Sequence, residues 1–261
     1  MGNGKWEMGN GKIIGAVSAV VVIGLISFWL LSGGDNGAIV DGGNGSVAVD
    51  AESSERPAAI DAILPVDEDS QIYIIDAAES EIYWRIYRSG ALARLGHNHV
   101  ISLTQFEGSV TVGSDVADSV WGLSFPVDAL IIDDPELRAR YGEDFESVPR
   151  EADKEGTKEN MLTEDLLDGA NFPEIRLEGN GVVGSLDAAS LPVSIYMLGR
   201  TIEQTFPASI SITADSVIVE GEYRLTHADL GLESFSLLGG AMAVGAEIDF
   251  TYRLRANVVA P

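Results

Sequence analysis

The chain has 261 residues, with 41 acidic and 16 basic side chains and a formal net charge of −25. This charge excludes nucleic acid as a partner, because binding to nucleic acid depends on lysine and arginine side chains that neutralise phosphates. The chain has no cysteine, which excludes disulfides, thiolate nucleophiles and thiolate metal ligands. The acid excess itself predicts a solvated, self-repelling surface.

The chain begins with a short flank, residues 1–12, followed by an uncharged apolar segment at residues 13–31. A helix needs about 20 apolar residues to cross a bilayer, whereas the apolar part of a secretory signal peptide usually has about 7–15. We therefore expect a single transmembrane signal anchor at residues 13–31. Residues 32–34, Ser-Gly-Gly, would fit a cleavage site, so removal of the segment is the alternative.

The charges on either side of the apolar segment predict its orientation. Lys5 and Lys12 precede it, while Asp35 and Asp41 follow it. The positive-inside rule then places the N-terminal flank in the cytoplasm. We expect a single-pass protein of the cell membrane whose remaining chain lies outside the cytoplasm, in the periplasm if the source is Gram-negative. Residues 32–70 are rich in Gly, Ala, Ser, Asp and Glu and are expected to form a flexible linker.

Alternation of apolar and polar residues predicts β-strands from residue 71 onward. In Glu81–Tyr87, the apolar side chains of Ile82, Trp84 and Ile86 recur at every second position. This period is typical of antiparallel strands with one buried face. Similar patterns predict strands at Ile72–Ile75, Phe106–Val112, Ser119–Ile132, Glu174–Val183, Pro192–Gly199, Phe206–Thr213, Ser216–Thr226 and Ala246–Ala256. Such a set is large enough to close one barrel, which removes unpaired edges.

A helical interruption divides the series of strands. Asp134 is a suitable N-cap, Pro135 favours the first helical position, and a glycine follows the last turn, so a short helix is predicted at residues 135–141. A second helix is expected at residues 151–168, because apolar side chains recur one turn apart and Gly169 follows as a stop signal.

Two of the three histidines lie in the stretch 95–112, which runs directly into a predicted strand. His97 and His99 are two residues apart, and in an extended chain such residues point to the same face. With His227 from a later strand, they could supply three nitrogen ligands to zinc or another transition metal. A metal- or haem-binding, redox-related barrel is therefore one hypothesis. The alternative is a hydrogen-bonded network of structural histidines.

Residues 82–106 contain no Asp or Glu but carry three arginines, among them Arg88 and Arg94. In a chain with this acid excess, an anionic group is least repelled here. Arginine suits phosphate oxygens because its guanidinium donates two parallel hydrogen bonds. We hypothesise that Arg88 and Arg94, with His97 or His99, bind a polar or phosphorylated group. Pairing of these arginines with surface acids is the alternative.

Catalytic groups have weaker support in the sequence. His227 and Asp229 could orient one another, and Ser234 and Ser236 lie nearby. The sequence has no Gly-x-Ser-x-Gly elbow or comparable setting for a nucleophile. The protein is therefore expected not to be an enzyme.

Six segments, in family order over about residues 71–258, together resemble the YceI-like proteins. They are Ile82-Tyr-Trp-Arg-Ile, Gly96-His97-Asn98-His99, Phe106-Glu-Gly, Asn160-Met-Leu-Thr-Glu-Asp-Leu-Leu-Asp, Gly169-Ala-Asn-Phe-Pro-Glu-Ile and Leu225-Thr-His-Ala-Asp-Leu-Gly-Leu. The Gly-His-Asn-His version replaces a different polar sequence in better-known members, which leaves the head-group chemistry open. The membrane anchor in place of a cleaved peptide is a second departure.

This resemblance implies an all-β, lipocalin-like antiparallel barrel of about eight strands with one or two short helices at residues 71–258. Such proteins are usually exported in bacteria and hold a polyisoprenoid or similar amphipathic lipid in a long central cavity. No cofactor is implied. The ligand-binding residues expected from the resemblance and from the acid-free window are Trp84, Ile86, Arg88, Arg94, His97, Asn98, His99, Phe106, Phe206 and Phe250.

An eight-stranded barrel is just wide enough for its own side chains or for one small ligand. A barrel filled by its own core would therefore explain Trp84, Phe206 and Phe250 equally well, and the protein would then be an interaction module. A continuous cavity distinguishes lipid binding from this alternative. Convergence of the three histidines distinguishes the metal-dependent or redox role.

Overall fold

The computed structural model of the protein describes residues 69–259. The expected cytoplasmic flank 1–12, the signal anchor 13–31 and nearly all of the linker 32–70 lie outside the described residues. Within the part that is described, no helix combines the length and the apolar character needed to cross a bilayer.

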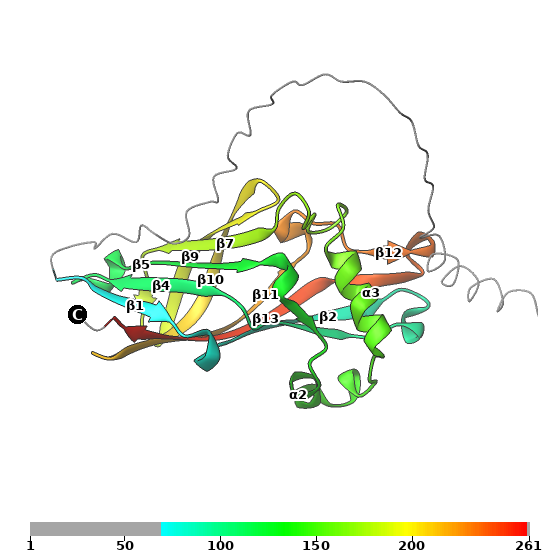
Figure 1. Ribbon diagram of the computed structural model, residues 1–261, viewed down its shortest axis with the longest axis horizontal. Helices are drawn as coiled ribbons and strands as arrows, with labels where there is room; N and C mark the ends of the chain where they lie inside the picture. Colours follow the sequence, from blue (N-terminus) through cyan, green and yellow to red (C-terminus); the bar gives the residue numbers. More distant parts are fainter. Residues whose placement is uncertain (1–68, 260–261) are drawn as a thin grey trace, which may run out of the picture. The chain divides into compact units, whose positions relative to one another are not determined.

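Within residues 69–259, eight antiparallel strands close into a barrel (Figure 1), which confirms the barrel implied by the sequence. In order around the ring they are β1 (Gln71–Ile75), β4 (Glu107–Val112), β5 (Val120–Pro126), β7 (Glu174–Asn180), β9 (Ala188–Met197), β10 (Arg200–Ile212), β11 (Ser216–Thr226) and β13 (Met242–Val258). β1 pairs with β13, with Tyr73 opposite Val258, and this pairing joins the two ends of the sheet. Closure leaves no unpaired edge in this ring.

β13 is long enough to pair with two strands along one of its edges. Its last residues pair with β1, and its earlier residues pair with β2 (Glu81–Ser89). β3 (His99–Leu103) and β6 (Leu130–Ile132) continue the sheet from β2. In the described part of the chain, two shorter strands complete it: β8 (Val183–Ser185) pairs with β9, and β12 (Ser236–Leu237) pairs with the start of β13.

The predicted strand at Ser119–Ile132 is interrupted in the structure. A 3-10 turn at Val127–Ala129 divides it into β5 and β6. The turn follows Pro126, which has no N–H group to donate to a neighbouring strand. The set of predicted strands also contained none at β3 (His99–Leu103), because the predicted strand in this region began at Phe106.

The first predicted helix begins where the sequence indicated. α2 (Pro135–Arg138) starts after Asp134, whose carboxylate accepts hydrogen bonds from the backbone N–H groups of Glu136 and Leu137. A 3-10 helix at Ala139–Phe145 continues it.

α3 (Glu151–Met161) is shorter than the helix predicted at residues 151–168. The Thr163 hydroxyl donates a hydrogen bond to the Asn160 carbonyl at 2.7 Å, and the following residues form turns. Hydroxyl groups that bond to backbone carbonyls compete in this way with helix continuation. The helix prediction was therefore wrong from residue 162 onward. α3 lies next to β6, where it covers one side of the barrel (Figure 1).

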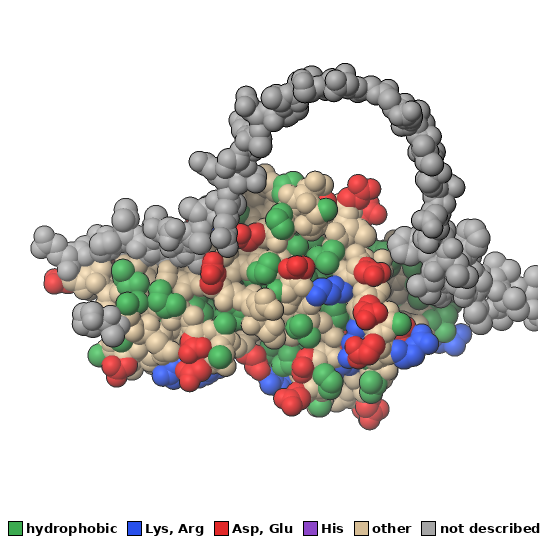
Figure 2. All heavy atoms as spheres, in the orientation of Figure 1, with side chains coloured by type: hydrophobic (Ala, Val, Ile, Leu, Met, Phe, Trp, Pro, Cys, Tyr) green, Lys and Arg blue, Asp and Glu red, His purple; other side chains and the backbone are tan. Residues whose placement is uncertain are grey.

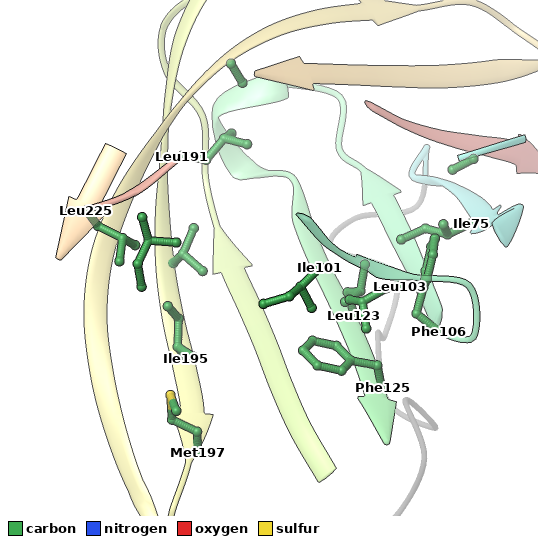
Figure 3. Packing of buried hydrophobic residues seen from close by; sticks show 14 of the residues in the cluster. Ile75, Ile101, Leu103, Phe106, Leu123, Phe125, Leu191, Ile195, Met197 and Leu225 are labelled. Atoms are coloured by element: carbon green, nitrogen blue, oxygen red, sulfur yellow. The ribbon is translucent and has the colours of Figure 1, made fainter. Parts of the chain in front are cut away.

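The barrel interior carries the main hydrophobic core. Five alternate residues of β9 are buried: Ala189, Leu191, Val193, Ile195 and Met197. Figure 3 shows Leu191, Ile195 and Met197 projecting from the same face of this strand into the cluster. Each large apolar side chain that is fully buried stabilises the fold by about 1.5–3 kcal/mol. The inward face of the barrel is therefore the main source of its stability.

Among the described residues, a smaller apolar cluster lies on the opposite face of β2 and β3. Its buried members are Tyr83, Val100, Leu137 and Phe145. Successive side chains of a strand point to opposite faces, so the neighbours of Tyr83 and Val100 face the interior. The Tyr141 hydroxyl also contacts the Tyr83 hydroxyl at 2.6 Å. These contacts hold the segment that contains α2 against the outside of the barrel.

Gly179 provides a test of the packing between β5 and β7. It lies opposite Trp121, and a Cβ atom at this position would lie 1.9 Å from the indole Nε1. We expect Gly179→Ala to lower the free energy of unfolding by about 1–3 kcal/mol, because an overpacked core must shift the ring or the strand. Urea denaturation measures this change.

Gly156→Ala in α3 is the matched control, because a Cβ atom there would meet nothing within 4 Å. Alanine is the better helix former, so this variant should gain up to about 1 kcal/mol. Equal stabilities of the Gly179 and Gly156 variants would contradict the packing described for Trp121.

Candidate ligand-binding cavity

A cavity of about 410 Å³ runs through the barrel. Residues from all the strands of the closed ring line it, together with residues from β2, β3 and α3. Met242 and Ala256 lie near the two ends of β13, and both line the cavity, so the cavity extends along most of this strand. Its volume falls within the range of about 300–1,000 Å³ that is typical of small-molecule sites. The barrel is therefore not filled by its own core.

Four of the expected apolar residues line this cavity: Trp84, Ile86, Phe206 and Phe250. Trp84 and Phe250 lie opposite one another on β2 and β13, and their rings stack with centroids 5.3 Å apart. Phe206 packs against Tyr223 with a centroid distance of 5.0 Å. The inward period-two positions thus place aromatic rings along the cavity wall.

Three of the expected polar residues, Arg88, His97 and His99, also line the cavity. Arg88 lies near the end of β2, is exposed, and donates a hydrogen bond from Nη1 to the Gly96 carbonyl at 2.8 Å. The rings of His97 and His99 lie 6.3 Å apart, in an edge-to-face arrangement. The structure therefore brings these three polar groups together at one end of a mainly apolar space.

The other three expected residues are not part of the cavity lining. Asn98 is buried, and it accepts a hydrogen bond from the Arg88 backbone N–H and donates one to the Asp144 carbonyl, each at 3.0 Å. Phe106 is packed in the main core. Arg94 is exposed in the 3-10 turn Ala93–Leu95. Asn98 and Phe106 therefore have structural contacts, and Arg94 lies outside the cavity.

All three histidines line the cavity, and each Nδ1 lies within hydrogen-bond distance of an oxygen. The oxygens are Ser147 Oγ for His97 at 3.1 Å, Asp133 Oδ2 for His99 at 2.6 Å, and the Ala246 carbonyl for His227 at 3.1 Å. Carbonyl and carboxylate oxygens only accept hydrogen bonds, so His99 and His227 donate from Nδ1. When the rings of His99 and His227 are neutral, their Nε2 atoms keep a lone pair.

The three-histidine metal hypothesis gains no support from the described residues. Among them, no group of three or more His, Asp or Glu side chains is arranged to hold a metal ion. The Nδ1 contacts instead fit the alternative of a hydrogen-bonded network.

The sequence also raised the possibility that His227 and Asp229 orient one another. The Asp229 carboxylate instead accepts hydrogen bonds from the backbone N–H and the hydroxyl of Thr226, each at 2.7 Å. His227 contacts the Ala246 carbonyl. Asp229 therefore stabilises the local turn that follows β11.

Asp133 is the centre of a buried polar network beside the cavity. The residue is only 1% exposed, and its carboxylate accepts hydrogen bonds from His99 Nδ1 at 2.6 Å, the Val100 backbone N–H at 2.9 Å and Arg138 Nη1 at 2.5 Å. Asp133 itself has a positive φ of 56°, a conformation that Asp and Asn adopt more readily than most residues. The carboxylate is thus fully surrounded by donors.

Arg138 extends this network to the loop that follows α2. Besides Asp133, its guanidinium donates to the backbone carbonyls of Asn98, Phe145 and Ser147 at 2.6–3.0 Å. Arg138 is buried together with its partner carboxylate. One ion pair therefore connects β3, β6 and the loop that contacts His97.

The pKa of Asp133 reflects this environment. Burial alone would raise the pKa of the carboxyl group, but the hydrogen bond and charge of His99, the Val100 N–H and the charge of Arg138 hold the pKa below its usual value. Asp133 is therefore ionised at neutral pH.

Sequence reasoning did not find Asp133 and Arg138. One signal was available: two consecutive acids precede Pro135, and only one of them is needed as the N-cap. The partner could not be read from spacing, because His99 lies 34 residues away and meets Asp133 through the pairing of β3 with β6.

The family described as the YceI-like domain matches residues 73–256. Among curated proteins, none matches the chain. The structure of BcnA from Burkholderia cenocepacia is similar, with a TM-score of 0.51 and 11% identity, over 70% of this chain and 99% of that one. A YceI protein from Campylobacter jejuni matches with a TM-score of 0.43 and 8% identity, over 61% of this chain and 85% of that one. A mutant of that protein has been crystallised with a monobromobimane guest.

Replacement of Asp133 tests the buried network. Asp133→Asn keeps the shape of the side chain and tolerates the positive φ, but it leaves the Arg138 charge without a partner. We expect the free energy of unfolding at neutral pH to fall by about 3–5 kcal/mol. Asp134→Asn is the neighbouring control, and it should be nearly neutral because Asn is also a good N-cap.

The pH dependence gives a second measurement on the same variants. A carboxyl group whose pKa is lowered on folding stabilises the fold above its unfolded pKa, about 3.9, and this contribution is lost as the pH falls through the folded value. The native chain should therefore lose stability below about pH 4, and Asp133→Asn should lose less than Asp134→Asn does. Parallel acid curves for the two variants would contradict the role of Asp133.

Proposed function

Because the chain belongs to the family of YceI-like domains over residues 73–256, we propose that it is a binding protein that holds a polyisoprenoid or similar amphipathic lipid in its barrel. Barrels of this family bind hydrophobic ligands. The observation that carries the proposal is the continuous apolar cavity, which extends along most of β13. A solidly packed barrel would have no place for such a ligand.

The energetics of tail burial support this proposal. Each methylene-sized group that leaves water for an apolar site gains about 0.8 kcal/mol. A long prenyl tail therefore has ample affinity for the cavity without specific polar contacts. The stacked rings of Trp84 and Phe250 supply a flat apolar wall against which such a tail can lie.

In the proposed complex, the polar head of the ligand lies beside Arg88, His97 and His99. Arg88 uses Nη1 for the Gly96 carbonyl, and its other N–H groups can donate to a phosphate or another anionic head. The Asp133 carboxylate orients His99, whose Nε2 is the ring nitrogen available to the ligand. Arg94, which lies outside the cavity, has no part in this head-group site.

We place the protein at the cell membrane as part of the same proposal. The predicted anchor at residues 13–31 would hold the chain with residues 1–12 in the cytoplasm and the barrel outside it. The proposal is binding without catalysis, and Asp229 bonds to Thr226 rather than to His227, so these two residues do not form the pair considered from the sequence. No cofactor is needed for this role.

Solvent extraction and native mass spectrometry of the purified full chain test the proposal. An amphipathic lipid should come off the native protein at about one molecule per chain. Val219→Glu places a charge in the cavity lining, and Ile218→Glu is the matched control on the same strand outside the lining. The amount of lipid retained per chain should fall more than about 10-fold in the first variant, because a buried unpaired charge is strongly unfavourable. Equal lipid retention by the two variants would contradict the proposal.

The head-group site is tested by competition between a polyprenyl phosphate and the matching polyprenol. Hydrogen bonds to a charged group contribute about 1.5–3 kcal/mol, so Arg88→Gln should lower the preference for the phosphate about 10-fold or more. Arg94→Gln should leave this preference unchanged, since Arg94 lies outside the cavity lining. An unchanged preference in Arg88→Gln would remove Arg88 from the site.

A further inference from the structure

Two segments without acidic residues meet at one end of the barrel. The first is residues 82–106, and the second is residues 234–246, which carry no charged residue at all. The end of β2 pairs with the start of β13, and the Leu92 backbone N–H donates to the Ala241 carbonyl at 2.8 Å. The fold therefore joins these two segments, although the chain has 41 acidic residues.

These segments expose apolar side chains around the opening of the cavity. Leu95 is 54% exposed, Phe235 37%, Leu237 50% and Leu238 62%. Phe235 and Leu237 also belong to the cavity lining, so these two residues contact both the cavity and solvent. Large apolar side chains that gather at an opening indicate an interaction surface rather than scattered surface residues.

Two basic side chains accompany this apolar group. Arg88 and Arg94 are both exposed, and Arg94 makes no ion pair with any described residue. At the end of the molecule where Figure 1 places β12, Figure 2 shows basic side chains with acidic side chains beside them. We call Arg88, Arg94, Leu95, Phe235, Leu237 and Leu238 the mouth surface.

We infer that the mouth surface docks on a bilayer that contains anionic lipids. Leucine and phenylalanine side chains enter the boundary between head groups and acyl chains, while arginines at the same level contact lipid phosphates. The net charge of −25 does not prevent this contact. Charges more than about 8–10 Å from the bilayer are largely screened at physiological salt, so Arg88 and Arg94, which lie in a segment without acidic residues, dominate the local interaction.

Charge complementarity and the opening of the cavity favour a bilayer over a protein partner. Docking at this surface aligns the cavity with the apolar phase from which a hydrophobic ligand comes. The predicted linker at residues 32–70 has a root-mean-square reach of about 35 Å, so the predicted anchor would keep the barrel near the membrane. The inference extends the proposed function, but it depends on the mouth surface and not on any bound ligand.

The experiment uses the full chain, reconstituted into vesicles of phosphatidylethanolamine and phosphatidylglycerol. The native sequence has no cysteine, so Leu238→Cys gives a single site for an environment-sensitive fluorophore. Val183→Cys is the matched control, because Val183 is 60% exposed on β8 at the other end of the barrel. Lipids with spin-labelled acyl chains should quench the fluorescence of the label at residue 238 and leave the fluorescence of the label at residue 183 unchanged. Equal quenching at the two sites would overturn the inference, as would a blue shift at 238 without quenching, which indicates burial against protein.

A second arm tests the role of charge. One arginine near an anionic surface contributes an effect of about fivefold, so Arg94→Gln should lower the ratio of docked to undocked protein by about that factor. Phosphatidylcholine vesicles should lower it further, and a ratio that responds to neither change would overturn the anionic-lipid assignment. Lipid retention by Arg94→Gln should stay native. Quenching at 238 in a chain that carries no lipid would leave docking intact and refute the proposed function instead.

Discussion

The pairing of β13 with both β1 and β2 is the constraint on which the rest of the structure depends. Tyr73 of β1 lies opposite Val258, and Glu81 of β2 lies opposite Arg253, so one strand joins both parts of the wall. The register between β13 and β2 shifts between Val244 and Ile248. Such an irregularity bends a strand and increases its twist. The same strand thus closes the ring and re-aims its first residues at the mouth of the cavity.

The buried Asp133–Arg138 pair plays a comparable part for the polar end of the cavity. Desolvation of two charges is costly, and apolar residues would pack the same space without this cost. The pair nevertheless bonds to His99, to the backbone beside it and to the Ser147 carbonyl, while the Ser147 hydroxyl contacts His97. The positions of two cavity histidines, His97 and His99, therefore depend on one ion pair outside the cavity. The pair offsets its desolvation cost by fixing where these two side chains lie.

The sequence could predict those features that depend on neighbouring residues. Inward positions such as Trp84 and Phe250 follow from the period of two, and the start of α2 follows from the Asp134 cap. The end of α3 could not be read in this way, because a hydroxyl at Thr163 competed with a continuing apolar pattern. Arg94 and His97 are close in sequence, yet only His97 lines the cavity, since a 3-10 turn holds Arg94 at the surface.

The distribution of acids connects the cavity with the surface around it. Strands inside the closed ring have no edge to protect, so acidic side chains on the outer wall of the ring serve mainly solubility and can be omitted locally. In the proposed complex, a long tail gains about 0.8 kcal/mol per buried methylene, and each 1.4 kcal/mol slows escape into water about tenfold. Exchange through water would then be very slow. A ligand held in this way leaves readily only where another apolar phase meets the opening, and the exposed Leu237 and Leu238 lie at that opening.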